Sequence, residues 1–201
     1  VEDTSTELKE NITHFDASTD ALVAYNKIVH DYSKIFEKLV LAQQEIGLNP
    51  KDGLYGELRA TVHQVQEYAK KSNDTGLLSK IYDLRKQEKD FMLRSDTKYL
   101  KSFVTKIDKL NADNQYSQMH SLLGEYKSSF GKLVQLEEVK GLDSKSGLLG
   151  NMRKTIHQST ETLKKLNHLI RELEHEKIEE IHAFSLIFTI LIALIVVLAL
   201  L

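Results

Sequence analysis

The scarcity of helix breakers is the feature that most restricts how this chain folds. Its 201 residues contain one proline, Pro50, and nine glycines. A β-rich protein of this length would need a turn about every ten residues, and such turns depend on glycine, proline and short polar side chains. We therefore expect an all-α protein of long helices, with enough residues to bury a core.

Clusters of glycine, serine, asparagine and aspartate divide the chain into predicted helices. These clusters combine residues that end helices with residues that cap the start of the next one. The apolar positions of the last helix step by threes and fours, which predicts a bundle or coiled-coil seam. The six predicted helices cover roughly 4–46, 53–71, 76–94, 97–110, 114–140 and 147–201.

The chain ends in an uncharged and almost uniformly apolar run, residues 183–201. A helix over this run would be ~28 Å long, about the hydrocarbon thickness of a bilayer. A buried core helix is the alternative, but no other segment is so uniformly apolar. We predict a transmembrane helix at 183–201, the second span of a receptor. Residues 171–182 carry more acids than bases, so residues 1–182 are expected outside, in the periplasm, with a first span upstream of Val1.

An internal repeat is the most specific pattern in the sequence. Residues 47–64 resemble residues 141–158, 94 positions later, and the same offset pairs Tyr32 with Tyr126. Each copy predicts a helix, a glycine-bounded turn and a second helix that starts on a Gly-Leu-x-Gly step. Two copies of one hairpin suggest two similar bundles, each with a similar site.

Both copies place an arginine and a histidine four residues apart: Arg59 with His63, and Arg153 with His157. Four residues are about one helical turn, so the two side chains share a face. A guanidinium and an imidazole between helices suit a carboxylate ligand through charge-assisted hydrogen bonds. The alternative is that these arginines form ordinary ion pairs near the surface, which contribute little to stability.

A second charged cluster occupies residues 84–94. Its charges alternate in sign, which is typical of a solvated helix face. Leu84, Phe91 and Met92 are apolar, however, so Arg85, Glu88 and Arg94 cannot all lie opposite them. We therefore expect some of these charges to be partly buried, where an unpaired charge is costly.

The two runs 53–59 and 84–99 resemble the helical bimodular sensor domain of methyl-accepting chemotaxis proteins (chemoreceptors) and some sensor kinases, and the resemblance covers most of 32–182. It implies two stacked four-helix-bundle modules that bind small carboxylates through arginines, with Arg85 and Arg153 as the anchors. Two departures are Lys86, where relatives often have arginine, and the lack of any arginine before Arg59. The candidate ligand-binding residues are Arg59, His63, Arg85, Lys89, Arg94, Tyr99, Arg153 and His157.

Other functions fit less well. The net charge of −2 without basic clusters disfavours a nucleic-acid partner, and the lack of cysteine excludes disulfides and thiolate sites. His175-Glu176 lacks the second histidine of a zinc protease motif, although His168, His175 and His182 could share a helix stripe. We expect no enzyme, metal or cofactor.

The resulting hypothesis is a homodimeric receptor of the bacterial inner membrane. Residues 1–182 would bind a small carboxylate, and helix 147–182 would pass the signal to a cytoplasmic region beyond Leu201. Two alternatives remain open: the sensor domain of a transmembrane histidine kinase, and a tail-anchored helical interaction protein.

Overall fold

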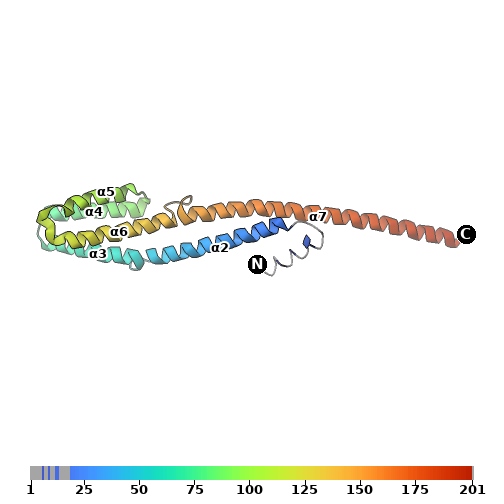
Figure 1. The fold of residues 1–201 in the computed structure, drawn as a ribbon, viewed down its shortest axis with the longest axis horizontal. Coiled ribbons are helices and arrows are strands. Elements are labelled where there is room, and N and C mark those ends of the chain that lie inside the picture. Colours follow the sequence, from blue (N-terminus) through green and yellow to red (C-terminus); the bar gives the residue numbers. More distant parts are fainter. Residues whose placement is uncertain (1–5, 7–8, 10–11, 14–18, 201) are drawn as a thin grey trace. The chain divides into compact units, whose positions relative to one another are not determined.

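The computed structural model describes residues 6, 9, 12–13 and 19–200, and at 193–200 it describes only the backbone. This part of the chain is all-α, with six α-helices and one 3₁₀ helix (Figure 1). The elements are α2 (Asp20–Ile46), α3 (Gly53–Lys71), α4 (Thr75–Arg94), α5 (Lys98–Asn111), η1 (Asn114–Met119), α6 (His120–Lys140) and α7 (Gly147–Leu200).

Most predicted helix boundaries are confirmed to within one residue, and two differ. The predicted helix 4–46 is interrupted, because Thr19 is not helical and α2 begins at Asp20. Most residues before Thr19 lie outside the described part. Thr19 accepts the first hydrogen bond of α2 from the Val23 amide at 3.0 Å, in a segment rich in N-cap residues. The predicted helix 114–140 opens with the 3₁₀ helix η1, because Tyr116 has non-helical backbone angles.

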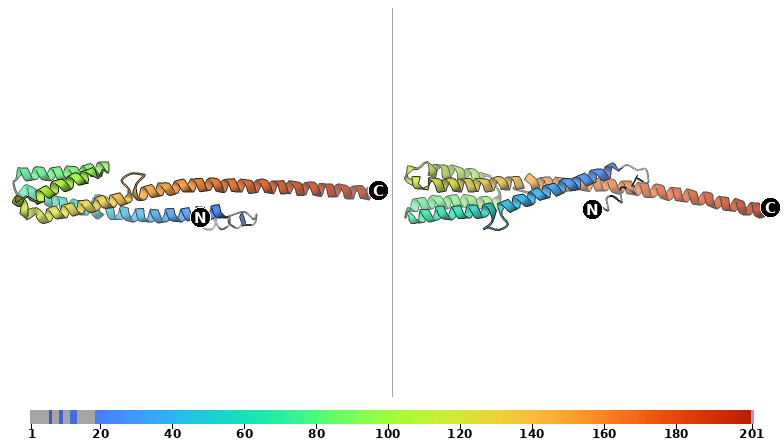
Figure 2. Two further views of the ribbon diagram at one scale, coloured as in Figure 1. Left: turned by 45° about the horizontal axis from the view of Figure 1, so that its top comes forward. Right: turned by 60° about the horizontal axis from the view of Figure 1, so that its bottom comes forward.

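The chain divides into two compact units, residues 33–154 and residues 1–32 with 155–201. In the first unit, α3, α4, α5 and α6 form an antiparallel four-helix bundle: α3 and α5 each pack against both α4 and α6 (Figure 2). Short connections join consecutive helices of this bundle, as expected for antiparallel neighbours.

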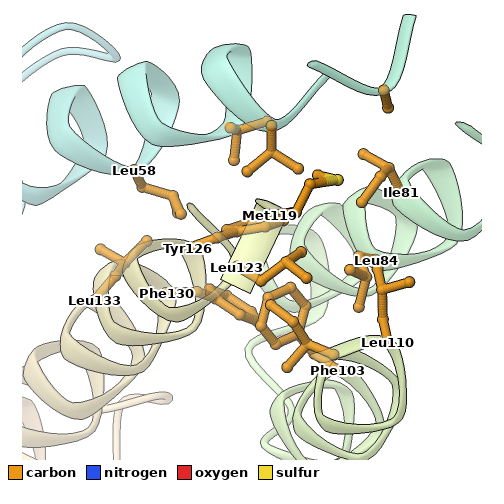
Figure 3. Close-up of a cluster of buried hydrophobic side chains, with 14 of the residues drawn as sticks. Leu58, Ile81, Leu84, Phe103, Leu110, Met119, Leu123, Tyr126, Phe130 and Leu133 are labelled. Atoms are coloured by element: carbon orange, nitrogen blue, oxygen red, sulfur yellow. The ribbon is translucent and has the colours of Figure 1, made fainter. Parts of the chain in front are cut away.

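Aromatic rings fill the centre of this bundle (Figure 3). The Phe103 ring lies edge-on to the rings of Tyr126 and Phe130, with centroid distances of 4.8 Å in both pairs. Phe91 adds a third edge-on contact to Phe130 at 5.7 Å. Such edge-to-face pairs are a favourable geometry for buried rings. They bring together side chains from α4, α5 and α6.

In the other unit, the described residues supply two long helical stretches, 20–32 of α2 and 155–200 of α7. A small buried cluster of Ile12, Leu22 and Leu166 holds this unit together. Within the described residues, α3 to α6 form one four-helix bundle, and the second stacked bundle that we expect stays a prediction.

The last helix, α7, is continuous from Gly147 to Leu200, as predicted. Among the residues that the structure describes, no helix carries a stretch apolar and long enough to cross a membrane. The second half of the predicted span, 193–201, lies outside the described side chains. The transmembrane helix therefore stays a prediction.

The two copies of the repeat form the same loop. Gly47 and Gly141 both end a helix with φ values of 117° and 118°, a region that favours glycine. Their amides donate to Gln43 and Glu137, which are also equivalent positions, and both hydrogen bonds measure 2.9 Å. The repeat is confirmed as two copies of one glycine-bounded turn.

Another pair of equivalent glycines, Gly56 and Gly150, lies one turn into α3 and α7. A Cβ atom at either position would lie 2.3 Å from a loop carbonyl oxygen, that of Lys51 or Lys145. A side chain there requires the backbone of the loop to move.

We therefore expect Gly56→Ala to lower the free energy of unfolding by about 2 kcal/mol, because the new methyl group overlaps the loop backbone. Gly124→Ala is the matched control: Gly124 is exposed in the second turn of α6, and its added Cβ would meet nothing within 4 Å. The control should raise the unfolding free energy by about 0.5–1 kcal/mol. Urea denaturation followed by circular dichroism measures both, and equal effects would contradict the close approach.

Candidate functional site

A cavity of about 500 Å³, open to solvent, lies in the unit formed by residues 33–154. Its walls come from the end of α2, the α2–α3 loop, α3 and α4. The residues that line it are Gln43, Gly47, Leu48, Asn49, Pro50, Tyr55, Leu58, Arg59, His63, Arg85, Glu88, Lys89 and Met92.

Four of the predicted ligand-binding residues meet in this cavity. Arg59 and His63 come from α3, and Arg85 and Lys89 come from α4. Each pair is four residues apart, so both members lie on the same face of their helix. Among the described residues, Arg59 and Lys89 form no ion pair, and the only carboxylate that lines the cavity is that of Glu88. The cavity is therefore cationic and suited to an anion.

The Glu88 carboxylate is held on both sides. One oxygen, Oε1, lies 2.6 Å from Nη1 of Arg85, and the other, Oε2, accepts a hydrogen bond of 2.7 Å from the Tyr126 hydroxyl. The Glu88 side chain is 1% exposed and that of Arg85 is 23% exposed. A guanidinium has five N–H donors, so Arg85 keeps donors for a ligand while Glu88 fixes its position.

The burial of Glu88 follows from its place in α4. The buried residues Leu77, Ile81, Leu84 and Phe91 recur every three or four positions, and Glu88 occupies the same stripe. The expectation that some charges of 84–94 are partly buried is confirmed for Glu88 and Arg85. This register was readable from the sequence, but Glu88 was not among the predicted site residues.

Two tyrosines beside the cavity are held in their neutral form. The Tyr55 hydroxyl donates to Glu137 of α6 at 3.1 Å. Burial, then the charge and the hydrogen bond of Glu137, raise the pKa of Tyr55 to about 12. Burial, then the Glu88 carboxylate, also raises the pKa of Tyr126 well above its ordinary value. Both phenols remain protonated donors at neutral pH.

The other predicted ligand-binding residues do not line this cavity. Arg94 is exposed, with its Nε 3.5 Å from the Asp90 carboxylate, and Tyr99 packs half-buried against the bundle core. Arg153 is exposed and donates to the Ser144 hydroxyl of the adjacent loop at 3.4 Å. His157 is also exposed.

The second, equivalent site that we expected around Arg153 and His157 stays a prediction, because the repeat reproduces only part of the first site. The cavity needs Arg85, Glu88 and Met92 of α4, but the matching segment ends at Gln64, before α4 begins. The copy with Arg153 and His157 therefore reproduces the loop and the helix that follows it, but it has no counterpart of α4.

Comparison with protein-family models, with curated proteins and with solved structures finds no match to this chain. Within the described residues, no three histidine, cysteine, aspartate or glutamate side chains are grouped so that they could bind a metal ion. The histidine stripe of His168, His175 and His182 is exposed on α7, where His168 lies 3.2 Å from Glu172.

The coupling between Arg85 and Glu88 can be measured directly. Arg85→Ala leaves a buried carboxylate without its cation, so we expect it to lower the unfolding free energy by about 3 kcal/mol. Arg59→Ala removes an exposed cation that forms no ion pair with any described residue, and it should change the unfolding free energy by less than about 0.5 kcal/mol.

Adding Glu88→Gln to Arg85→Ala should restore part of the loss, because the amide can stay buried without a charge and still accept from Tyr126. A double-mutant cycle from urea denaturation gives this coupling. Additive effects of the two substitutions would show that the pair is not linked as described.

Proposed function

We propose that this chain is the sensor domain of a bacterial chemoreceptor and that the α2–α4 cavity binds a small carboxylate. The observation that supports this is the convergence of Arg59, Arg85 and Lys89 on one cavity with a single, already paired carboxylate. Three cations around an open cavity favour an anionic ligand, and guanidinium forks match the two oxygens of a carboxylate.

Binding would rest on charge-assisted hydrogen bonds. Arg85, fixed by Glu88, supplies a preorganised donor, whereas Arg59 and Lys89 are exposed and can close over the ligand. Each such bond contributes about 1.5–3 kcal/mol, against which the cost of association must be set. The expected dissociation constant therefore lies in the micromolar to millimolar range.

Two contacts connect the cavity walls to α6. The Lys140 Nζ lies 3.4 Å from Oε1 of Gln43, and Tyr55 donates to Glu137. Gln43 and Tyr55 both line the cavity, so a ligand that shifts these side chains also acts on the end of α6. A difference of a few kcal/mol between two packings is enough to change their populations.

The membrane part of the proposal concerns α7. Phe184, Leu186, Ile187 and Phe188 are all exposed large apolar side chains, as a lipid-facing helix would present. We assign 183–201 to a transmembrane span in the inner membrane, residues 1–182 to the periplasm, and signal output to a cytoplasmic region downstream.

The same proposal includes a homodimer. Stretches 20–32 and 155–182 supply two helices per chain, so two copies would supply the four of a second stacked bundle. The large apolar side chains of Val23, Ile156 and Leu163 are exposed on these stretches. A sensor-kinase output would use the same cavity and the same dimer.

The test is calorimetric titration of the full chain, in amphipol, with a panel of carboxylic acids. At least one acid should bind, and Arg59→Ala and Lys89→Ala should each weaken it about tenfold or more. Neither substitution removes an ion pair among the residues that the structure describes, so folding should be unaffected. Lys86→Ala, on the same helix but outside the cavity, should leave the affinity unchanged. Binding that is insensitive to Arg59 and Lys89, or confined to neutral compounds, would refute the proposed site.

A further inference from the structure

The shape and lining of the cavity restrict its ligand beyond its charge. Resting on the anion site proposed above, we infer that the ligand is an amphipathic carboxylate: an acid group at one end and an apolar body, aromatic or branched, at the other. The head lies among Arg59, Arg85 and Lys89. The body lies against Leu48, Pro50 and the ring of Tyr55, with Met92 opposite.

The cavity has two ends of different chemistry. Because α3 and α4 are antiparallel neighbours, Tyr55 near the start of α3 and Met92 near the end of α4 lie at the same end of the cavity, beside the α2–α3 loop. That loop contributes the apolar side chains of Leu48 and Pro50 to the lining, beside Gly47 and Asn49, and the Asn49 side chain is hydrogen-bonded within the loop to Asp52 and the Lys51 amide. The cationic side chains sit further along both helices, from Arg59 and Lys89 to His63 and Arg85. A ligand with one anionic and one apolar end matches this division.

The repeat provides an internal comparison for the apolar end. Leu48 and Leu142 are equivalent residues of the two matching loops. Leu142 is partly buried and packs against the bundle core, whereas Leu48 is 72% exposed at the rim of the cavity. The equivalent leucine therefore packs against the core in one copy of the loop and is exposed in the other. Of these two leucines, Leu48 is the one that lines the cavity. An apolar ligand group bound there would remove its side chain from water.

The size of the cavity agrees with a ligand larger than the simplest acids. A volume of about 500 Å³ is within the range of sites for drug-sized ligands. At about 30 Å³ per water molecule, a compact acid with fewer than about ten non-hydrogen atoms would leave roughly half of that space to solvent. An attached ring or branched chain fills this space and removes apolar surface from water, which favours binding.

The test compares four ligands by calorimetry on the full chain in amphipol, with empty amphipol titrated in parallel: 3-phenylpropionate, succinate, citrate and the neutral amide of 3-phenylpropionate. We expect 3-phenylpropionate to bind at least tenfold more tightly than succinate, which is a compact acid, and than citrate, which is slightly larger than 3-phenylpropionate but has no apolar body. Tighter binding of succinate or citrate would overturn this inference and leave the anion site intact. Binding of the amide as tightly as the acid, or of no ligand, would overturn both.

Substitutions locate the apolar end. Met92→Gln and Leu48→Asn should each weaken 3-phenylpropionate about three- to tenfold while leaving the affinity for succinate within twofold. Leu93→Gln is the control, because Leu93 is on the same helix, is exposed and does not line the cavity. Unchanged binding of 3-phenylpropionate in both cavity variants would contradict the assignment of the apolar end.

Discussion

One buried carboxylate links the core of the bundle to its surface. Glu88 occupies a core position of α4, and its charge is acceptable there only because Arg85 pairs with it from the cavity side and Tyr126 of α6 donates to it from inside. These two contacts fix the guanidinium at the cavity wall and connect α4 to α6. The guanidinium of Arg85 is therefore positioned by the core of the protein rather than by the ligand.

The glycine-bounded loops provide the second constraint. They end α2 and α6 with the same backbone angles and start α3 and α7 in the same way, because the glycines admit close carbonyl contacts that a side chain would block. One loop closes the cavity and the other does not. The two loops differ in their surroundings, because α4 lines the cavity beside the first loop and the repeat contains no second copy of α4. A duplicated backbone motif has thus kept its geometry, while the cavity of about 500 Å³ is lined by the loop of the first copy.

Sequence reasoning predicted most of the fold, because the boundaries between helices are set by local chemistry that glycine, serine and aspartate reveal. It did not extend to features that depend on tertiary packing. The arrangement of α3 to α6 in a single bundle is set by which apolar faces meet, and helix count alone does not decide that.

The site was predicted in part for the same reason. Arg59 and His63 were recognisable from their helical spacing, and Arg85 and Lys89 from the charged run 84–94 that resembles the sensor-domain motif. The role of Tyr126 was not, because it comes from a helix 38 positions away in the chain. Arg153 was expected to anchor a second site because of the resemblance to the sensor-domain family, and that site stays a prediction. The repeat reproduces the loop and one helix beside Arg153, but not the segment that corresponds to α4.

The most direct measurement is NMR of the arginine side-chain Nε–Hε groups of the full chain during titration with 3-phenylpropionate. The account predicts that the Arg59 and Arg85 signals shift together and saturate at one ligand per chain, because both guanidinium groups line the cavity. The Arg153 signal should remain in place. Saturable binding that shifts Arg153 and leaves Arg59 and Arg85 unchanged would contradict the central claim that the α2–α4 cavity is the ligand site.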